Sequence, residues 1–172
     1  MNAPVNIREE QPGDRATVHR INREAFGQDA EADLVDRLRA NGKATLSLVA
    51  EQDDRIVGHI LFSPVTIESA AGTITLLGLA PMAVLPPHQK QGIGTVLVER
   101  ALALLKAAGH RGVVVLGHPG YYPRFGFIPA STFGIRCGYD APDEAFMALE
   151  LTPDALKGCS GLAKFQPEFA GV

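Results

Sequence analysis

Residues 86–110 read "PPHQKQGIGTVLVERALALLKAAGH", and their first part, QKQGIG (89–94), opens a predicted helix. A helix N-terminus carries unpaired N–H groups and a partial positive charge. Glycines at this place let a ligand approach the main chain closely, and Lys90 adds a cation. Such a loop predicts a site for a phosphate or pyrophosphate group, although Gly92 and Gly94 could also simply form a tight turn.

The predicted helix ends near Ala108, and Gly109 follows it as a suitable C-terminal cap. The apolar residues at helical spacing predict a buried stripe made of Ile93, Val96, Leu97, Ala101, Leu104 and Leu105. The β-branched run GVVVLG (112–117) then predicts a buried strand.

The rest of the chain predicts a mixed α/β sheet in one domain covering residues 1–172. A short strand and two helices come first, and three antiparallel strands follow between residues 45 and 85, with a hairpin turn at 52–55. Pro81 lies inside the last of these strands and indicates a bulge or an edge, because proline donates no hydrogen bond. A turn-rich segment and a further strand complete the pattern.

Two familiar phosphate-binding motifs are missing from the loop. The P-loop pattern GxxxxGK[ST] is absent, and Leu97 occupies the third glycine position of the dinucleotide fingerprint GxGxxG. A nucleotide-binding protein that uses ATP or NAD is therefore a weaker alternative.

A second feature, YYPRFGF (121–127), follows directly after the strand GVVVLG. These aromatic residues could be ordinary core residues. A tyrosine also carries a hydroxyl with a pKa near 10, so it could donate a proton to a thiolate leaving group.

Composition excludes several classes of protein. The net charge of −3 and the lack of a long basic or apolar run predict neither a nucleic-acid partner nor a membrane span. The N-terminus shows no secretory pattern, and Cys137 and Cys159 show no CxxC spacing, which favours reduced thiols in the cytoplasm. The five histidines show no paired helical spacing, so no metal site is predicted.

The two features together resemble the GNAT superfamily, the Gcn5-related N-acetyltransferases, and look closest to its YhbS-like branch. The family's loop motif [Q/R]xxGx[G/A] is matched by Gln89, Gly92 and Gly94. The family's tyrosine, four residues before a Gly-Phe pair, is matched by Tyr122. The order of the predicted elements also matches, so the resemblance covers nearly the whole chain.

The resemblance implies the GNAT (acyl-CoA N-acyltransferase) fold, with acetyl-CoA as cofactor. This fold has a mixed, mostly antiparallel twisted sheet of about seven strands with flanking helices and a V-shaped splay between strands four and five. The pantetheine arm would pair with the main chain of the fourth strand, and the pyrophosphate would lie on the loop. The implied cofactor-binding residues are Met82, Ala83, Val84, Gln89, Lys90, Gln91, Gly92, Ile93, Gly94 and Thr95.

The resemblance also implies catalytic roles. A primary amine would attack the thioester, the Val84 N–H would hold the oxyanion, and Tyr122 would protonate the CoA thiolate. Many relatives use a glutamate on strand four as base, but TITLLGLAPMAV (73–84) has no carboxylate or histidine. Water or His118 could serve instead, and His118 could equally be an ordinary loop histidine.

The acceptor would lie against the acidic segment EAFGQDAEADL (24–34), where Glu24 and Phe26 are the candidate contacts. The acidic residues favour a cationic small-molecule or peptide amine, although they could also form a solvated face. The resemblance allows a homodimer. A non-catalytic CoA-binding or sensory module on the same fold is the alternative function.

Overall fold

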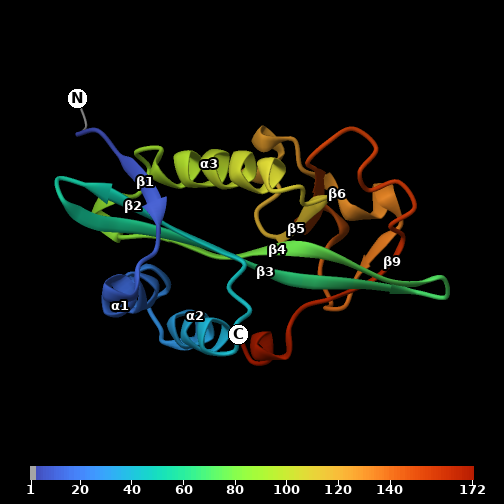
Figure 1. Cartoon of the computed structure of the whole chain (residues 1–172), viewed down its shortest axis with the longest axis horizontal. Coiled ribbons are helices and arrows are strands. Elements are labelled where there is room, and N and C mark those ends of the chain that lie inside the picture. Colours follow the sequence, from blue (N-terminus) through green and yellow to red (C-terminus); the bar gives the residue numbers. More distant parts are fainter. Residues whose placement is uncertain (1–2) are drawn as a thin grey trace. The chain divides into compact units, whose positions relative to one another are not determined.

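A computed structural model describes residues 3–172, and Figure 1 shows its elements in chain order. The chain divides into two compact units. Unit 1 consists of the described residues up to Ser63 together with Ala80–Leu102 and Pro167–Val172. Unit 2 consists of Pro64–Leu79 and Ala103–Gln166. The assignment of all 172 residues to a single domain stays a prediction.

The described residues form three α-helices and nine strands. The helices are α1 (Arg15–Phe26), α2 (Ala30–Ala40) and α3 (Ile93–Ala107). The strands are β1 (Asn6–Glu9), β2 (Leu46–Gln52), β3 (Arg55–Ser69), β4 (Gly72–Val84), β5 (Gly112–Leu116), β6 (Ile128–Pro129), β7 (Ile135–Cys137), β8 (Phe146–Glu150) and β9 (Gly161–Lys164). Within residues 3–172, no helix is both long and apolar enough to cross a membrane.

The strands belong to one mixed sheet with the order β1-β2-β3-β4-β5-β8-β6, and β9 pairs with β3 and β7. Most neighbours are antiparallel, as predicted, whereas β5 pairs with β4 in parallel at Leu77–Val113 and Gly78–Val114. The sheet has nine strands instead of about seven. The strands β6 and β7 are too short for a sequence pattern, and β9 forms because residues 66–68 of β3 offer it an edge.

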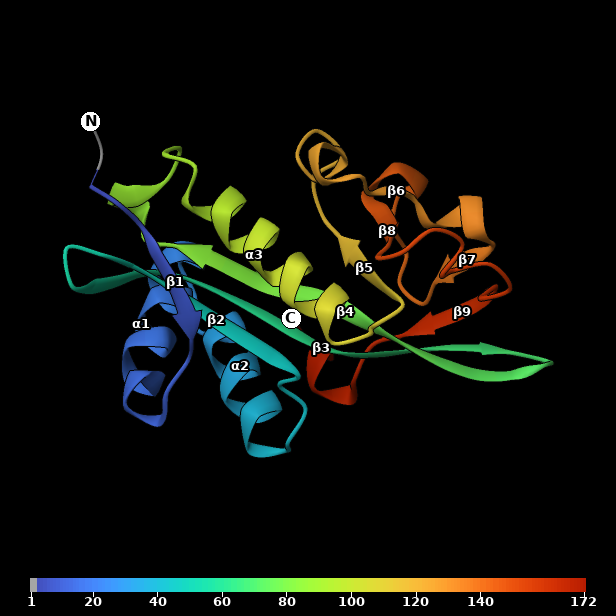
Figure 2. The same ribbon diagram turned by 45° about the horizontal axis from the view of Figure 1, so that its top comes forward.

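Unit 1 is built in layers, and Figures 1 and 2 show α1 and α2 lying side by side against the strands. The two helices pack on one face of β2 and β3, and the core there comprises Val18, Leu34, Val35, Leu38, Val49 and Leu61. On the opposite face, a Cβ atom at Gly58 would meet Ile93 and Leu97 of α3 at 3.2 Å. The start of α3 is thereby fixed against the sheet.

The predicted buried stripe of α3 is partly wrong. Val96 and Leu104 are 41% and 40% exposed, whereas Val98 is buried. The buried face is centred on Leu97 and Leu105, and residues one position earlier lie about 100° around the helix axis, on its flank.

Unit 2 has its own apolar core around the parallel contact of β4 and β5. Its strands β5 and β8 pair antiparallel from Gly112–Glu150 to Leu116–Phe146. Buried residues from several elements fill the core, namely Val65, Ile67, Leu76, Val114, Ala130, Ile135, Phe146, Ala148, Leu156, Cys159 and Ala163.

The C-terminal segment is attached to unit 1 through Glu168. Its carboxylate accepts hydrogen bonds from Lys43 Nζ at 2.8 Å and from Asn41 Nδ2 at 2.7 Å, and Arg37 donates to the Glu168 carbonyl oxygen at 3.0 Å. The bonds from Lys43 and then Asn41 lower the pKa of the Glu168 carboxyl from 4.5 to about 2.

We expect Glu168→Gln to lower the free energy of unfolding by about 1 kcal/mol at pH 7. Because the pKa is lower in the folded chain, this contribution is present above about pH 4.5 and is lost as the pH falls towards 2. Denaturant unfolding of both proteins from pH 8 to pH 3 measures the difference. The exposed residue Glu99 supplies the control Glu99→Gln. A difference that stays constant below pH 4.5 would contradict the assignment.

Candidate active site

The backbone of the loop QKQGIG has a positive φ at two residues, Gly92 and Lys90. It follows a 3-10 turn at Pro86–His88 and leads into α3, which begins at Ile93. Gly92 has a φ of +84° and Lys90 a φ of +62°. A positive φ at a lysine is uncommon and is maintained only where the surrounding chain fixes it.

Main-chain N–H groups gather at the start of α3. In residues 3–172, the amides of Lys90, Gln91, Gly92, Ile93 and Gly94 donate to no protein group, and the helical bonding begins with Val96 N–H to Gly92 O at 3.1 Å. Five consecutive amide donors together with the helix dipole create a strong preference for an anion. The free amides are compatible with the predicted phosphate site, which stays a prediction.

The glutamine of the motif connects the loop to the end of β4. Gln89 Nε2 donates to the Val84 carbonyl oxygen at 2.9 Å, and Gln91 Nε2 donates to the Pro87 carbonyl oxygen at 3.3 Å. Met82 and Val84 are half-buried and Ala83 is buried. The carbonyl of Val84 thus already holds one donor, and its second lone pair is the one left for a ligand.

Tyr122 lies in unit 2 at the start of a 3-10 turn, with its side chain packed among aromatic rings. The residue is 7% exposed, and its ring makes edge contacts with Tyr121 and Phe127 at centroid distances of 5.1 and 5.7 Å. The packing against these two rings thus fixes the position of the Tyr122 ring.

Burial changes the acidity of the Tyr122 hydroxyl. Desolvation, followed by the nearby Tyr121, raises the pKa of Tyr122 from 10 to about 12. Tyr122 therefore stays protonated throughout the neutral and mildly alkaline range, which is the form that a proton donor needs.

Gly117, which is not among the predicted site residues, lies against the Tyr122 ring. A Cβ atom at Gly117 would lie 2.5 Å from Cε2 and 3.0 Å from Cδ2 of the Tyr122 ring. The Gly117 N–H also donates to the Ala145 carbonyl oxygen at 2.9 Å, which holds the main chain in place. Gly117 comes directly after the buried run of β5 and five residues before Tyr122. This position in the sequence could have indicated that it lies close to the tyrosine.

The other candidates are exposed. The carbonyl oxygen of His118 accepts bonds from the amides of Tyr121 and Tyr122 at 3.0 and 3.3 Å, so this residue helps to form the turn. Glu24 lies 3.6 Å from Arg20 in an ion pair on the surface of α1, and Phe26, at the end of that helix, is 42% exposed.

The candidate residues fall into two groups. Unit 1 contains the loop, the end of β4, Glu24 and Phe26, whereas unit 2 contains Tyr122, His118 and Gly117. Within unit 1, the Gln89 bond brings the predicted loop and Val84 together. The roles assigned to the individual residues stay predictions.

Comparison with known proteins gives consistent matches over most of the chain. Residues 43–129 match the family model of the acetyltransferase (GNAT) domain. The uncharacterized N-acetyltransferase YhbS of Escherichia coli K12 is 38% identical over 164 residues, which cover 95% of this chain and 97% of that protein.

Two solved structures are similar in both fold and sequence. The crystal structure of YhbS from Escherichia coli in complex with CoA has a TM-score of 0.91 and 36% identity, and the match covers 98% of this chain and 93% of that one. A GNAT family acetyltransferase from Brucella melitensis in complex with acetyl-CoA has a TM-score of 0.79 and 37% identity, with 96% and 98% covered.

Proposed function

The chain belongs to the GNAT family of acyl-CoA-dependent N-acetyltransferases, and from this premise we propose that it transfers an acetyl group to a primary amine. It has the GNAT fold and uses acetyl-CoA as cofactor. The observation that carries the proposal is the run of five amides without protein acceptors, from Lys90 to Gly94, at the start of α3.

The proposed cofactor site runs from the end of β4 into the loop. The main chain at Met82, Ala83 and Val84 pairs with the pantetheine amides, and the loop from Gln89 to Thr95 binds the pyrophosphate. The bond from Gln89 to the Val84 carbonyl supports this division, because it holds the two segments of unit 1 together. Lys90 supplies the only cationic side chain of the QKQGIG stretch.

The proposed reaction is a direct transfer. The neutral amine nitrogen forms a bond to the acetyl carbon, and the Val84 N–H donates to the resulting oxyanion. The C–S bond then breaks, and the nitrogen loses one proton while the sulfur gains one. Tyr122 supplies the hydroxyl that donates towards the sulfur. The buried ring and the raised pKa, which keeps the hydroxyl protonated, support this role.

The base is proposed to be water or His118. His118 is exposed and follows the end of β5 by two positions. On β4, the stretch from Thr73 to Val84 contains no carboxylate or histidine that could act as the base. His59 in β3 is unsuited to the task. It is completely buried, and desolvation followed by the charge of Arg39 lowers its pKa to about 3.

The acceptor is proposed to be a small-molecule or peptide amine that carries positive charge and contacts Glu24 and Phe26. The exposed carboxylates at the α1–α2 junction support a cationic acceptor, whereas Glu31 is buried and accepts two bonds from Gln28 Nε2 at 2.8 and 3.1 Å. Glu31 is therefore assigned to the fold. We also propose that the whole chain forms one catalytic domain and that the protein is a homodimer.

We expect Gly94→Asp to lower the affinity for acetyl-CoA at least tenfold. A carboxylate in the first turn stabilises the helix but repels the pyrophosphate. A loss of affinity in this variant therefore does not result from a loss of folding. Titration calorimetry with acetyl-CoA measures the affinity, and Ala103→Asp, on an exposed position of the same helix, is the charge-matched control. Equal affinities for the two variants would contradict the proposed pyrophosphate site.

The activity itself is tested by mixing acetyl-CoA with a panel of amines and following the release of free CoA thiol. Turnover with a cationic amine, faster than with neutral amines of similar basicity, supports the proposal. Tight acetyl-CoA binding without turnover on any amine would favour the non-catalytic CoA-binding module. Absence of acetyl-CoA binding would overturn both readings.

A further inference from the structure

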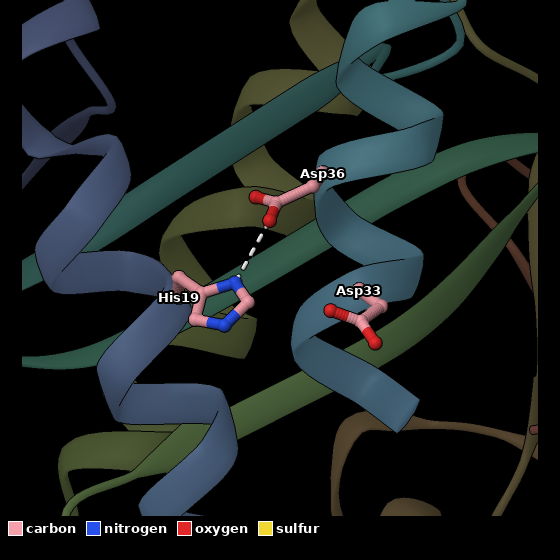
Figure 3. Close-up of side chains that lie close together, drawn as sticks. All are labelled: His19, Asp33 and Asp36. Carbon is pink, nitrogen blue, oxygen red and sulfur yellow. Dashed lines mark hydrogen bonds and ion pairs between the residues drawn. The ribbon is translucent and has the colours of Figure 1, made fainter. Parts of the chain in front are cut away.

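Three potential metal ligands converge between the first two helices of unit 1. His19 projects from α1, and Asp33 and Asp36 project from the same side of α2, because residues three apart are neighbours on a helix. Figure 3 shows the imidazole and the two carboxylates facing the space between these helices. One ligand atom from each residue lies within 4.8 Å of the other two.

The distances suit coordination of a single ion after a small adjustment. His19 Nδ1 lies 2.8 Å from Asp36 Oδ2. Nitrogen and oxygen ligands lie about 2.0–2.2 Å from a zinc ion, so two adjacent ligands of one ion are about 3 Å apart. Asp33 has an exposed side chain on the first turns of α2, and a rotamer change there costs little.

Asp36 is held in the required orientation by neighbouring charged groups. Its Oδ1 accepts from Arg39 Nη1 at 3.1 Å, which leaves Oδ2 directed at His19. Arg39 is in turn fixed by Glu10, whose Oε2 lies 2.5 Å from Arg39 Nη2 and whose Oε1 accepts from Ser47 Oγ at 2.9 Å. Hydrogen-bonded partners of this kind orient metal ligands and are a usual part of metal sites.

The surroundings leave room for water ligands. His19 and Asp36 line an open cavity of about 730 Å³ together with Arg15, Ala16, Arg39 and Ala40. The guanidinium of Arg15 lowers the affinity for a cation, whereas the charge of Arg39 is offset by Glu10. Because His19 and Asp36 face this open cavity, water can fill the coordination positions that the protein ligands leave open.

From this arrangement we propose that His19, Asp33 and Asp36 form a binding site for a first-row divalent transition-metal ion, represented by Zn²⁺. One imidazole and two carboxylates suit such ions, whereas Ca²⁺ and Mg²⁺ prefer oxygen ligands throughout. On binding, the ion takes the place of the hydrogen bond between His19 Nδ1 and Asp36 Oδ2. The proposal is independent of acetyl transfer, and the ion joins α1 to α2.

Calorimetric titration of the untagged, EDTA-treated full chain with ZnCl₂ tests the site. We expect one ion per chain, and we expect His19→Ala and Asp33→Asn each to lower the affinity at least tenfold. Asp54→Asn removes an exposed carboxylate from the β2–β3 turn, where asparagine accepts the φ of +60°, and is the matched control with unchanged affinity. Zinc should also raise the melting temperature of the wild type more than that of Asp33→Asn.

Cobalt(II) distinguishes this site from binding at a thiol. Absorption bands typical of nitrogen and oxygen ligands, lost in Asp33→Asn, support the proposal. A thiolate charge-transfer band would assign the ion to a cysteine, and equal zinc affinity in wild type, His19→Ala and Asp33→Asn would overturn the site. Circular dichroism verifies that each variant is folded. If His19→Ala does not fold, the zinc affinity of Asp33→Asn alone decides whether the site exists.

Discussion

Tyr122→Phe should lower kcat by about 10²–10⁴-fold, the range expected for the loss of a positioned proton donor. The ring contacts with Tyr121 and Phe127 remain, because phenylalanine keeps the aromatic ring. Steady-state release of CoA thiol with a saturating amine measures kcat, and calorimetry should find the affinity for acetyl-CoA unchanged within about twofold. Tyr121→Phe, which changes the adjacent ring in the same way, is the control and should retain most of the activity.

The pH dependence provides a second test of the same residue. Because burial raises the pKa of Tyr122 to about 12, the hydroxyl stays almost fully protonated up to about pH 10. The rate should therefore rise as the acceptor amine loses its proton and should show no fall from tyrosine ionisation up to pH 10. An alkaline decrease near pH 9 that disappears in Tyr122→Phe would contradict the pKa, and full activity of Tyr122→Phe would remove the residue from the mechanism.

Gly117→Ala should lower kcat by about 10–100-fold, although this residue contributes no side chain to the reaction. The new methyl group would lie 2.5 Å from Cε2 of Tyr122, so the ring has to shift by roughly 1 Å. The main chain cannot easily yield, since the Gly117 N–H is bonded to Ala145 O. Kinetics and calorimetry should show a loss in kcat with nearly unchanged affinity for acetyl-CoA.

The control for this prediction is Gly120→Ala in the same loop. A Cβ atom at Gly120 meets no heavy atom within 4 Å, so that variant should keep wild-type kcat. Overpacking at Gly117 should also lower the free energy of unfolding by about 1–3 kcal/mol, which denaturant unfolding detects. If Gly117→Ala has normal kcat, the position of the Tyr122 ring does not limit the reaction.

Local patterns in the sequence were sufficient for most elements. The two-residue turn at Asp53 and Asp54 has the positive φ values of a tight hairpin, and Gly109 ends α3 as predicted. The buried residues of α2, Leu34, Val35 and Leu38, follow helical spacing. These features depend on neighbours in the chain, so spacing and turn chemistry report them directly.

The loop QKQGIG is also a feature that depends mainly on neighbouring residues in the chain. The start of a helix has free amides whatever lies elsewhere in the fold, and the unpaired donors from Lys90 to Gly94 agree with that expectation. The family resemblance, which rested on this loop and on Tyr122, is confirmed by the GNAT domain match and by YhbS.

The sequence by itself therefore determined the family and the mixed sheet of this protein, and it predicted the free amides at the start of α3. Only the tertiary structure decided that Val96 is exposed, that Gly117 makes room for Tyr122, and that His19 meets Asp33 and Asp36. The histidines show no paired spacing along one helix, whereas His19 and the two aspartates come from two helices. Such contacts depend on which faces pack together, and residue spacing along the chain carries no direct record of that packing.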